Sequence, residues 1–118
     1  MNEQYIIDLE SKAKTEIEEI KEFLRICEIC RDYYGVDPDM FYNRVKIRTR
    51  DVVDCRAVAI WFGYQYFISL GKLAWSRMAN VLKMDHASMI HNKNKVDSLL
   101  RFDKPTKLAV EQLKKMIK

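Results

Sequence analysis

Turn-forming residues are scarce in this chain: its 118 residues include three glycines and two prolines. So few turn formers favour long helices over a sheet with many tight turns. No apolar run approaches the ~20 residues that a membrane-spanning helix needs. The first residues include Glu3 and Asp8, which are untypical of a secretory leader. We therefore expect one soluble cytoplasmic domain with no membrane partner.

Cysteine is also scarce, and the three cysteines are an odd number for a disulfide scaffold. Cys27 and Cys30 form a C-x-x-C pair, but this pair falls inside a helical pattern and lacks a second ligand pair nearby. Redox chemistry favours such a pair at a helix N-terminus after a strand. We expect all three to be small buried side chains, with no metal site.

The motifs of nucleotide-dependent and hydrolytic enzymes are missing. Glycines at positions 35, 63 and 71 cannot form the phosphate loop G-x-x-x-x-G-K-[ST]. No Ser-His-Asp set, pair of catalytic carboxylates or metal-ligand cluster is recognisable. We expect neither an enzyme nor a bound nucleotide or other cofactor.

Apolar residues recur every three or four positions in the first third of the chain, which predicts a helix over 2–34 with one apolar face. They are Ile6, Leu9, Ala13, Ile17, Ile20, Leu24 and Cys27. Gly35 is suited to ending this helix. Pro38 predicts the first turn of a short helix capped by Asp37. The long first helix is also a candidate for docking a partner or a second copy.

Further helices are separated by polar segments and by glycine or proline. Basic residues alternate over 43–50, which predicts a loop. A third helix is expected from Thr49 or Asp51 to about Phe67. The remaining pattern predicts helices over 72–83 and 87–100, and a final helix that begins near Pro105. The expected fold class is all-α with five to six helices, in three parts: the amphipathic helix of 1–29, a helix-turn-helix region over 30–101, and a C-terminal helix over 102–118.

Charge is unevenly distributed around a net value of +4. The first 22 residues hold seven acidic side chains and three lysines. Basic residues concentrate further along, at Arg44, Lys46, Arg48, Arg50 and Arg56. An acidic head and a basic middle are typical of a nucleic-acid-binding domain with one contact face. A solvated basic surface without a partner fits the same distribution.

The segment 84–96 has the pattern of a helix-turn-helix. A short apolar helix pattern ends before it, and Asp85 then offers an N-cap for a helix that opens with His86 and Ser88. Two helices joined by a tight turn, the second with polar residues at its start, is the arrangement that presents side chains to base edges. The alternative for Asp85 is a plain N-cap, and for His91 a packed core histidine.

These residues resemble a known family. Asp85-His86-Ala87-Ser88-Met89-Ile90-His91, followed by Lys95-Val96, is similar to the signature of the C-terminal DNA-binding domain of the bacterial replication initiator DnaA. That signature reads roughly Arg-Asp-His-Thr-Thr-Val-x-His, with a Lys and a β-branched residue after it. Tyr33-Tyr34 before a short helix, the basic 44–50 segment and Arg56-Ala57-Val58-Ala59-Ile60 extend the resemblance over about residues 30–100.

The resemblance implies a trp-repressor-like helix-turn-helix that binds double-stranded DNA. Basic-loop arginines of the family enter the minor groove, and signature residues read the major groove. The implied DNA-binding residues are Arg44, Lys46, Arg48, Arg50, Arg56, Lys83, Asp85, His86, Ala87, Ser88, His91, Asn92 and Lys95. Met84 replaces the signature arginine, Ala87 replaces its first threonine, and Lys83-Met84 replaces a Gly-Gly turn.

The resulting functional prediction is sequence-specific binding of double-stranded DNA, in replication initiation or its regulation, without the ATPase of an initiator. Two alternatives remain. One is a transcriptional regulator, and the other is a helical protein-interaction module that kept the fold but not DNA binding.

Overall fold

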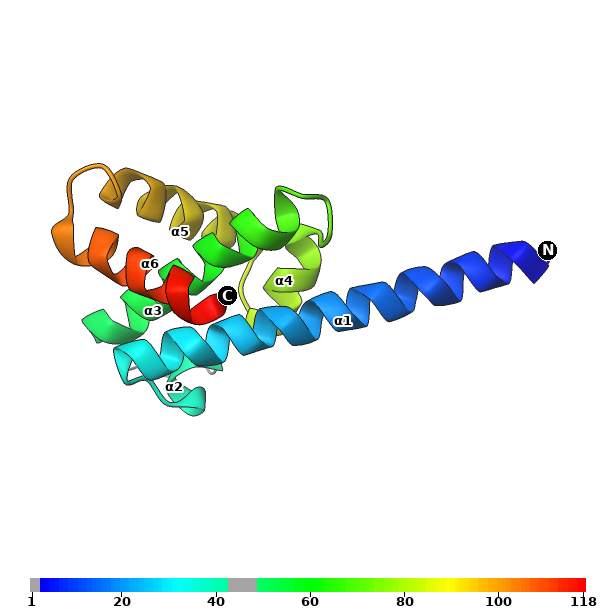
Figure 1. Cartoon of the computed structure of the whole chain (residues 1–118), viewed down its shortest axis with the longest axis horizontal. Helices are drawn as coiled ribbons and strands as arrows, with labels where there is room; N and C mark the ends of the chain where they lie inside the picture. Colours follow the sequence, from blue (N-terminus) through cyan, green and yellow to red (C-terminus); the bar gives the residue numbers. More distant parts are fainter. Residues whose placement is uncertain (1–2, 43–48) are drawn as a thin grey trace.

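The computed structural model describes residues 3–42 and 49–118, apart from the side chains of 5–9 and 12. Within these ranges the chain forms six α-helices and one π-helical turn and has no strand. The all-α prediction is therefore confirmed. The elements are α1 (Glu3–Tyr34), α2 (Pro38–Tyr42), α3 (Arg50–Gly63), the π-helical η1 (Tyr64–Ile68), α4 (Trp75–Leu82), α5 (His86–Leu99) and α6 (Lys104–Ile117) (Figure 1). None of the described helices is long and apolar enough to cross a membrane.

The central element is α3, which contacts α1, α2, η1 and α5. Every residue from Ala57 to Gly63 is buried. A helix that is apolar on all sides must be covered on all sides. The other helices therefore assemble around α3: α1 lies along one side of it and α5 along another (Figure 1).

The first helix has two different halves. Its C-terminal half packs into the core through Phe23, Ile26, Cys27 and Cys30. Its N-terminal half projects away from the rest of the molecule (Figure 1), which gives the molecule extents of 54 × 29 × 24 Å. The helix begins and ends within a residue of its predicted bounds of 2–34.

The turn chemistry is as expected at three helix starts. Asp37 accepts a hydrogen bond from the Met40 backbone at 3.0 Å, and Asp85 caps α5. Asp103 accepts from the Thr106 backbone at 3.1 Å, with Pro105 in the first turn of α6. These three starts follow from a short acidic side chain that satisfies an orphan N–H.

Two predicted elements differ from the structure. The expected third helix changes at Gly63 into the π-helical turn η1, in which Ser69 N–H donates to the Tyr64 carbonyl at 2.8 Å. The expected 72–83 helix begins at Trp75, because Gly71 takes a left-handed conformation (φ +72°) and Leu73 is buried in the core. The buried leucine holds the chain out of helical conformation before α4.

The cysteine prediction is confirmed as far as burial is concerned. Cys27, Cys30 and Cys55 are free thiols and completely buried. Burial is the main cause that raises the pKa of all three above the ordinary value of a thiol. Because the thiolate is the reactive form, these side chains are unsuited to redox or nucleophilic chemistry.

Gly63 marks the closest approach of the helices around the core. A Cβ atom at this position would lie 2.4 Å from Met78 Cε and 2.7 Å from Phe23 Cε1. The absence of a side chain therefore lets α1, α3 and α4 meet at one point.

We predict that Gly63→Ala lowers the free energy of unfolding by about 1–3 kcal/mol, because the added methyl overpacks the core. Chemical denaturation followed by circular dichroism measures this change. Met78→Ala in the same chain makes room for the methyl, so the double variant should lose less than the sum of the two single losses. Strict additivity would show that the contact at Gly63 does not limit packing.

Candidate nucleic-acid interface

A tight left-handed turn joins α4 to α5. Lys83 ends α4 with φ 54° and ψ 43°, and Met84 N–H donates to the Ala79 carbonyl at 3.0 Å. Glycine is usual at this position because it accepts positive φ without strain. The lysine keeps the turn short and leaves its own side chain exposed. This turn places the start of α5 beside α4, as the helix-turn-helix prediction requires.

Asp85 is the N-cap of α5. Its Oδ1 accepts a hydrogen bond from Ser88 N–H at 2.7 Å, and its Oδ2 accepts one from the Ser88 hydroxyl at 2.9 Å. Asn92 Nδ2 donates to the Ser88 carbonyl at 2.8 Å. The cap interpretation of Asp85 is confirmed. Ser88 and Asn92 are half-buried and engaged within the helix, so they have less freedom to reach a base.

The outward face of α5 carries His86, Ala87, His91 and Asn94, all of them exposed. His91 is therefore not a packed core histidine. The His86 ring lies against Trp75 of α4, with 6.1 Å between ring centroids. Asn94 was not among the predicted residues, although it lies three positions after His91 on the same face of the helix.

The inner face of α5 is fixed to α3 by a polar contact. Asp97, the only acidic residue within α5, accepts a hydrogen bond from Trp61 Nε1 at 2.8 Å and pairs with Lys93 at 2.7 Å. Lys93 also lies over the Tyr64 ring, 4.2 Å from its centroid. Partial burial by itself raises the pKa of Asp97, but the hydrogen bonds from Lys93 and Trp61 outweigh it and hold this pKa below its ordinary value. The carboxylate is thereby kept away from the outward face.

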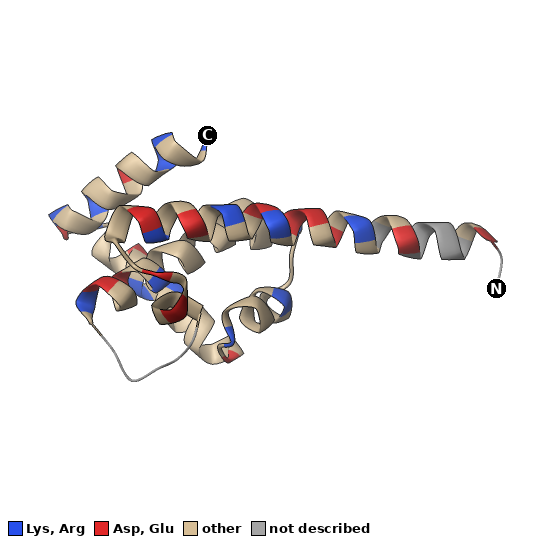
Figure 2. Ribbon diagram, turned by 90° about the horizontal axis from the view of Figure 1, so that it is seen from below, with Lys and Arg blue, Asp and Glu red and all other residues tan. Residues whose placement is uncertain are grey.

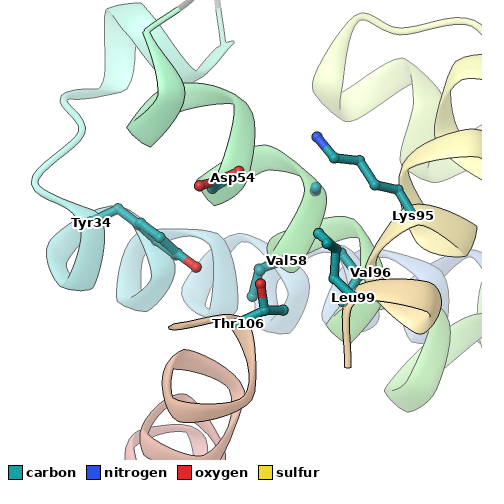
Figure 3. A pocket seen from close by; sticks show the side chains of 8 residues that line it. Tyr34, Asp54, Val58, Lys95, Val96, Leu99 and Thr106 are labelled. Carbon is teal, nitrogen blue, oxygen red and sulfur yellow. The ribbon is translucent and has the colours of Figure 1, made fainter. Parts of the chain in front are cut away.

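Two predicted basic residues flank this face at different depths. Lys83 is exposed at the turn. Lys95 is half-buried and lines a small hollow between α3, α5 and α6, together with Tyr34, Asp54 and Thr106 (Figure 3). Lys95 is therefore partly withdrawn from the outward face that carries His91.

The predicted arginines divide into three groups. Arg50 begins α3 with a side chain that is 86% exposed and lies 3.7 Å from Asp54. The guanidinium of Arg56 donates to the carbonyl of Phe41 at 2.8 Å and to that of Met40 at 2.7 Å. The structure thus gives Arg56 a structural role, which is to hold α2 against α3. The predicted contacts of Arg44, Lys46 and Arg48 and the predicted loop that contains them lie outside the described residues.

The described residues contain no group of three His, Cys, Asp or Glu side chains arranged to hold a metal ion. No known protein family matches the chain, and a search of curated proteins found no match. The DnaA resemblance accordingly remains a prediction based on the quoted residues.

We predict that Asp97→Asn lowers the free energy of unfolding by about 1–2 kcal/mol at neutral pH, a range that is reduced for partial exposure. A carboxylate whose pKa is lowered by folding stabilises the protein above its unfolded pKa of about 3.9, and this contribution is lost as the pH falls through the folded pKa. The difference between wild type and variant should therefore shrink in acid, below about pH 4. Denaturation series at several pH values measure it. A difference that stays constant down to strong acid would contradict the role of the Asp97 charge.

Proposed function

We propose that this protein binds double-stranded DNA, with α5 as the helix that enters the major groove. One observation carries the proposal: the outward face of α5 presents exposed polar and small side chains, while the helix's one acidic residue is held on the opposite side. A groove-binding helix needs both properties, since a carboxylate directed at the phosphates would repel them. The left-handed turn before α5 supports the same interpretation.

The residues on this face match the chemistry of base edges. His86, His91 and Asn94 have side chains that donate and accept hydrogen bonds, and Ala87 offers a methyl group to thymine. The helix begins at His86, so its positive end favours nearby phosphates. Lys83 is suited to contact the backbone beside this end.

The biological role proposed is replication initiation or its regulation, on the strength of the resemblance to the DnaA domain. The chain has no phosphate loop, so we propose site occupancy rather than an ATP-driven step. Regulation of transcription by the same occupancy is the nearest alternative.

A second candidate function is a protein-interaction module that retains the fold without DNA binding. Ile90, which is 38% exposed, favours it, because it adds an apolar side chain to the solvent side of α5. Hot spots of protein interfaces are commonly apolar side chains of this kind surrounded by polar ones. The two candidates differ in whether duplex DNA is retained at all.

We predict that His91→Ala weakens binding to a selected DNA site by about 1–3 kcal/mol and has little effect on a scrambled duplex, because base contacts specify while phosphate contacts position. Competition binding at one salt concentration measures both affinities. Ser98→Ala is the matched control: Ser98 is exposed near the other end of α5. Equal losses on both duplexes, or an equal loss in the control, would contradict the assignment of α5.

The affinity should also fall steeply with salt. If about four to six basic side chains neutralise phosphates, log K should fall against log salt with a slope of about −4 to −5. Titrations of a labelled duplex at increasing salt measure this slope. Replacing Arg44, Lys46 and Arg48 by glutamine should make it shallower. Retention of a protein partner with no DNA retention at low salt would favour the interaction module instead.

A further inference from the structure

The projecting half of α1 carries an apolar stripe that its own chain does not cover. Ile17 is 54% exposed and Leu24 is 37% exposed, Ala13 is exposed and Ile20 is half-buried. This stripe is separate from the buried face of α1. Phe23 and Ile26 pack into the core from positions about a quarter to nearly half a turn around the helix from Leu24.

The spacing of the stripe is that of a straight interface. Ala13 and Leu24 are 11 residues apart, and in the sequence Ile6 and Ile17, and Leu9 and Ile20, are separated by the same interval. Eleven residues make almost three whole turns, so a stripe with this repeat runs straight along a helix. It therefore extends beyond the core along the projecting half, for which one small domain has no need.

One flank of the stripe is closed and the other is open. Glu16 lies on one side and pairs with Arg77 of α4 at 3.6 Å, so α4 stands beside this flank. Glu10 and Lys21 lie on the other side, and both are exposed. Glu10 and Lys21 are about 16 Å apart along one helix, too far to pair within the chain. Acidic and basic residues alternate along α1, as Figure 2 shows.

From these observations we propose that the stripe is the interface of a homodimer in which two α1 helices pair in antiparallel orientation, centred near Ile17. The occupant is a second copy because the stripe and its open flank complement themselves. An antiparallel copy brings Ala13 opposite Ile20, a small side chain against a large one. It also brings Glu10 of each chain near Lys21 of the other.

The orientation follows from the closed flank. In a parallel pair the closed flank of one chain would meet the open flank of the other, and α4 stands in this space. In an antiparallel pair the open flanks meet each other, and the two globular parts lie at opposite ends of the paired helices. The overlap of residues 9–24 spans about 24 Å of helix. An interface of this length is close to the lower limit of about 1,000 Å² for specific pairs, so we expect a dimer that dissociates on dilution.

Sedimentation velocity of the full chain over a series of concentrations without DNA tests the proposal. We expect a concentration-dependent dimer in the wild type, and a monomer for Ile17→Glu at every concentration. Leu108→Glu on α6 is the matched control, because Leu108 is 52% exposed and lies away from the stripe. It should leave the dimer unchanged. Circular dichroism checks that each variant is folded.

The charge pair tests the orientation. Glu10→Lys and Lys21→Glu should each weaken the dimer several-fold, and the double variant should restore it. A parallel pair keeps positions 10 and 21 apart, so it predicts no restoration. A wild type that is monomeric at every concentration, a dimer unaffected by Ile17→Glu, or a double variant without restoration would each overturn the proposal. None of these measurements depends on DNA binding.

Discussion

The burial of α3 is the constraint on which the rest of this structure depends. Its last seven residues, from Ala57 to Gly63, are all buried, and apolar surface of this extent must be removed from water on every side. The chain has only helices with which to do so. Gly63 sets how closely they approach, because even a methyl group there would collide with Met78 and Phe23. The positions of α1, α4 and α5 follow from this one requirement.

The candidate interface is a consequence of the same packing. Met89 and Val96 direct the inner face of α5 into the core, so the opposite side of the helix is left to solvent. Asp97 and Trp61 then fix the rotation of α5 about its own axis, because a hydrogen bond between their side chains has only one geometry at that site. A helix fixed in rotation presents the same side chains at all times. Preorganisation of this kind is what groove recognition requires.

Much of the fold was predictable because local chemistry determined it. Asp37, Asp85 and Asp103 each precede a helix, and each caps it through the mechanism that the sequence implied. The late start of α4 was not predictable, because it depends on a tertiary contact, the burial of Leu73. The π-helical turn after Gly63 has no distinct signal in periodicity.

The candidate site shows the same division. The exposure of His86 and His91 followed from their place on the helix. The role of Arg56 did not, because a sequence shows that an arginine is present but not that two carbonyls of α2 lie within its reach. The partnership of Trp61 and Asp97 joins residues 36 positions apart, which no local pattern reveals. Only the spacing of Lys93 and Asp97, four residues apart on one helix, was visible in advance.

The two proposed surfaces gain a common meaning from the continuity of α1. This helix runs unbroken from the stripe around Ile17 to the core residues Phe23 and Ile26, so a second copy bound to the stripe is connected rigidly to the body that carries α5. Two modules joined in this way bind DNA as a pair only if both reach it at once. A flexible linker would leave their separation undefined, whereas a helix fixes it. The straight 11-residue spacing therefore bears on DNA recognition as well as on pairing, since it determines how far apart two copies of α5 are held.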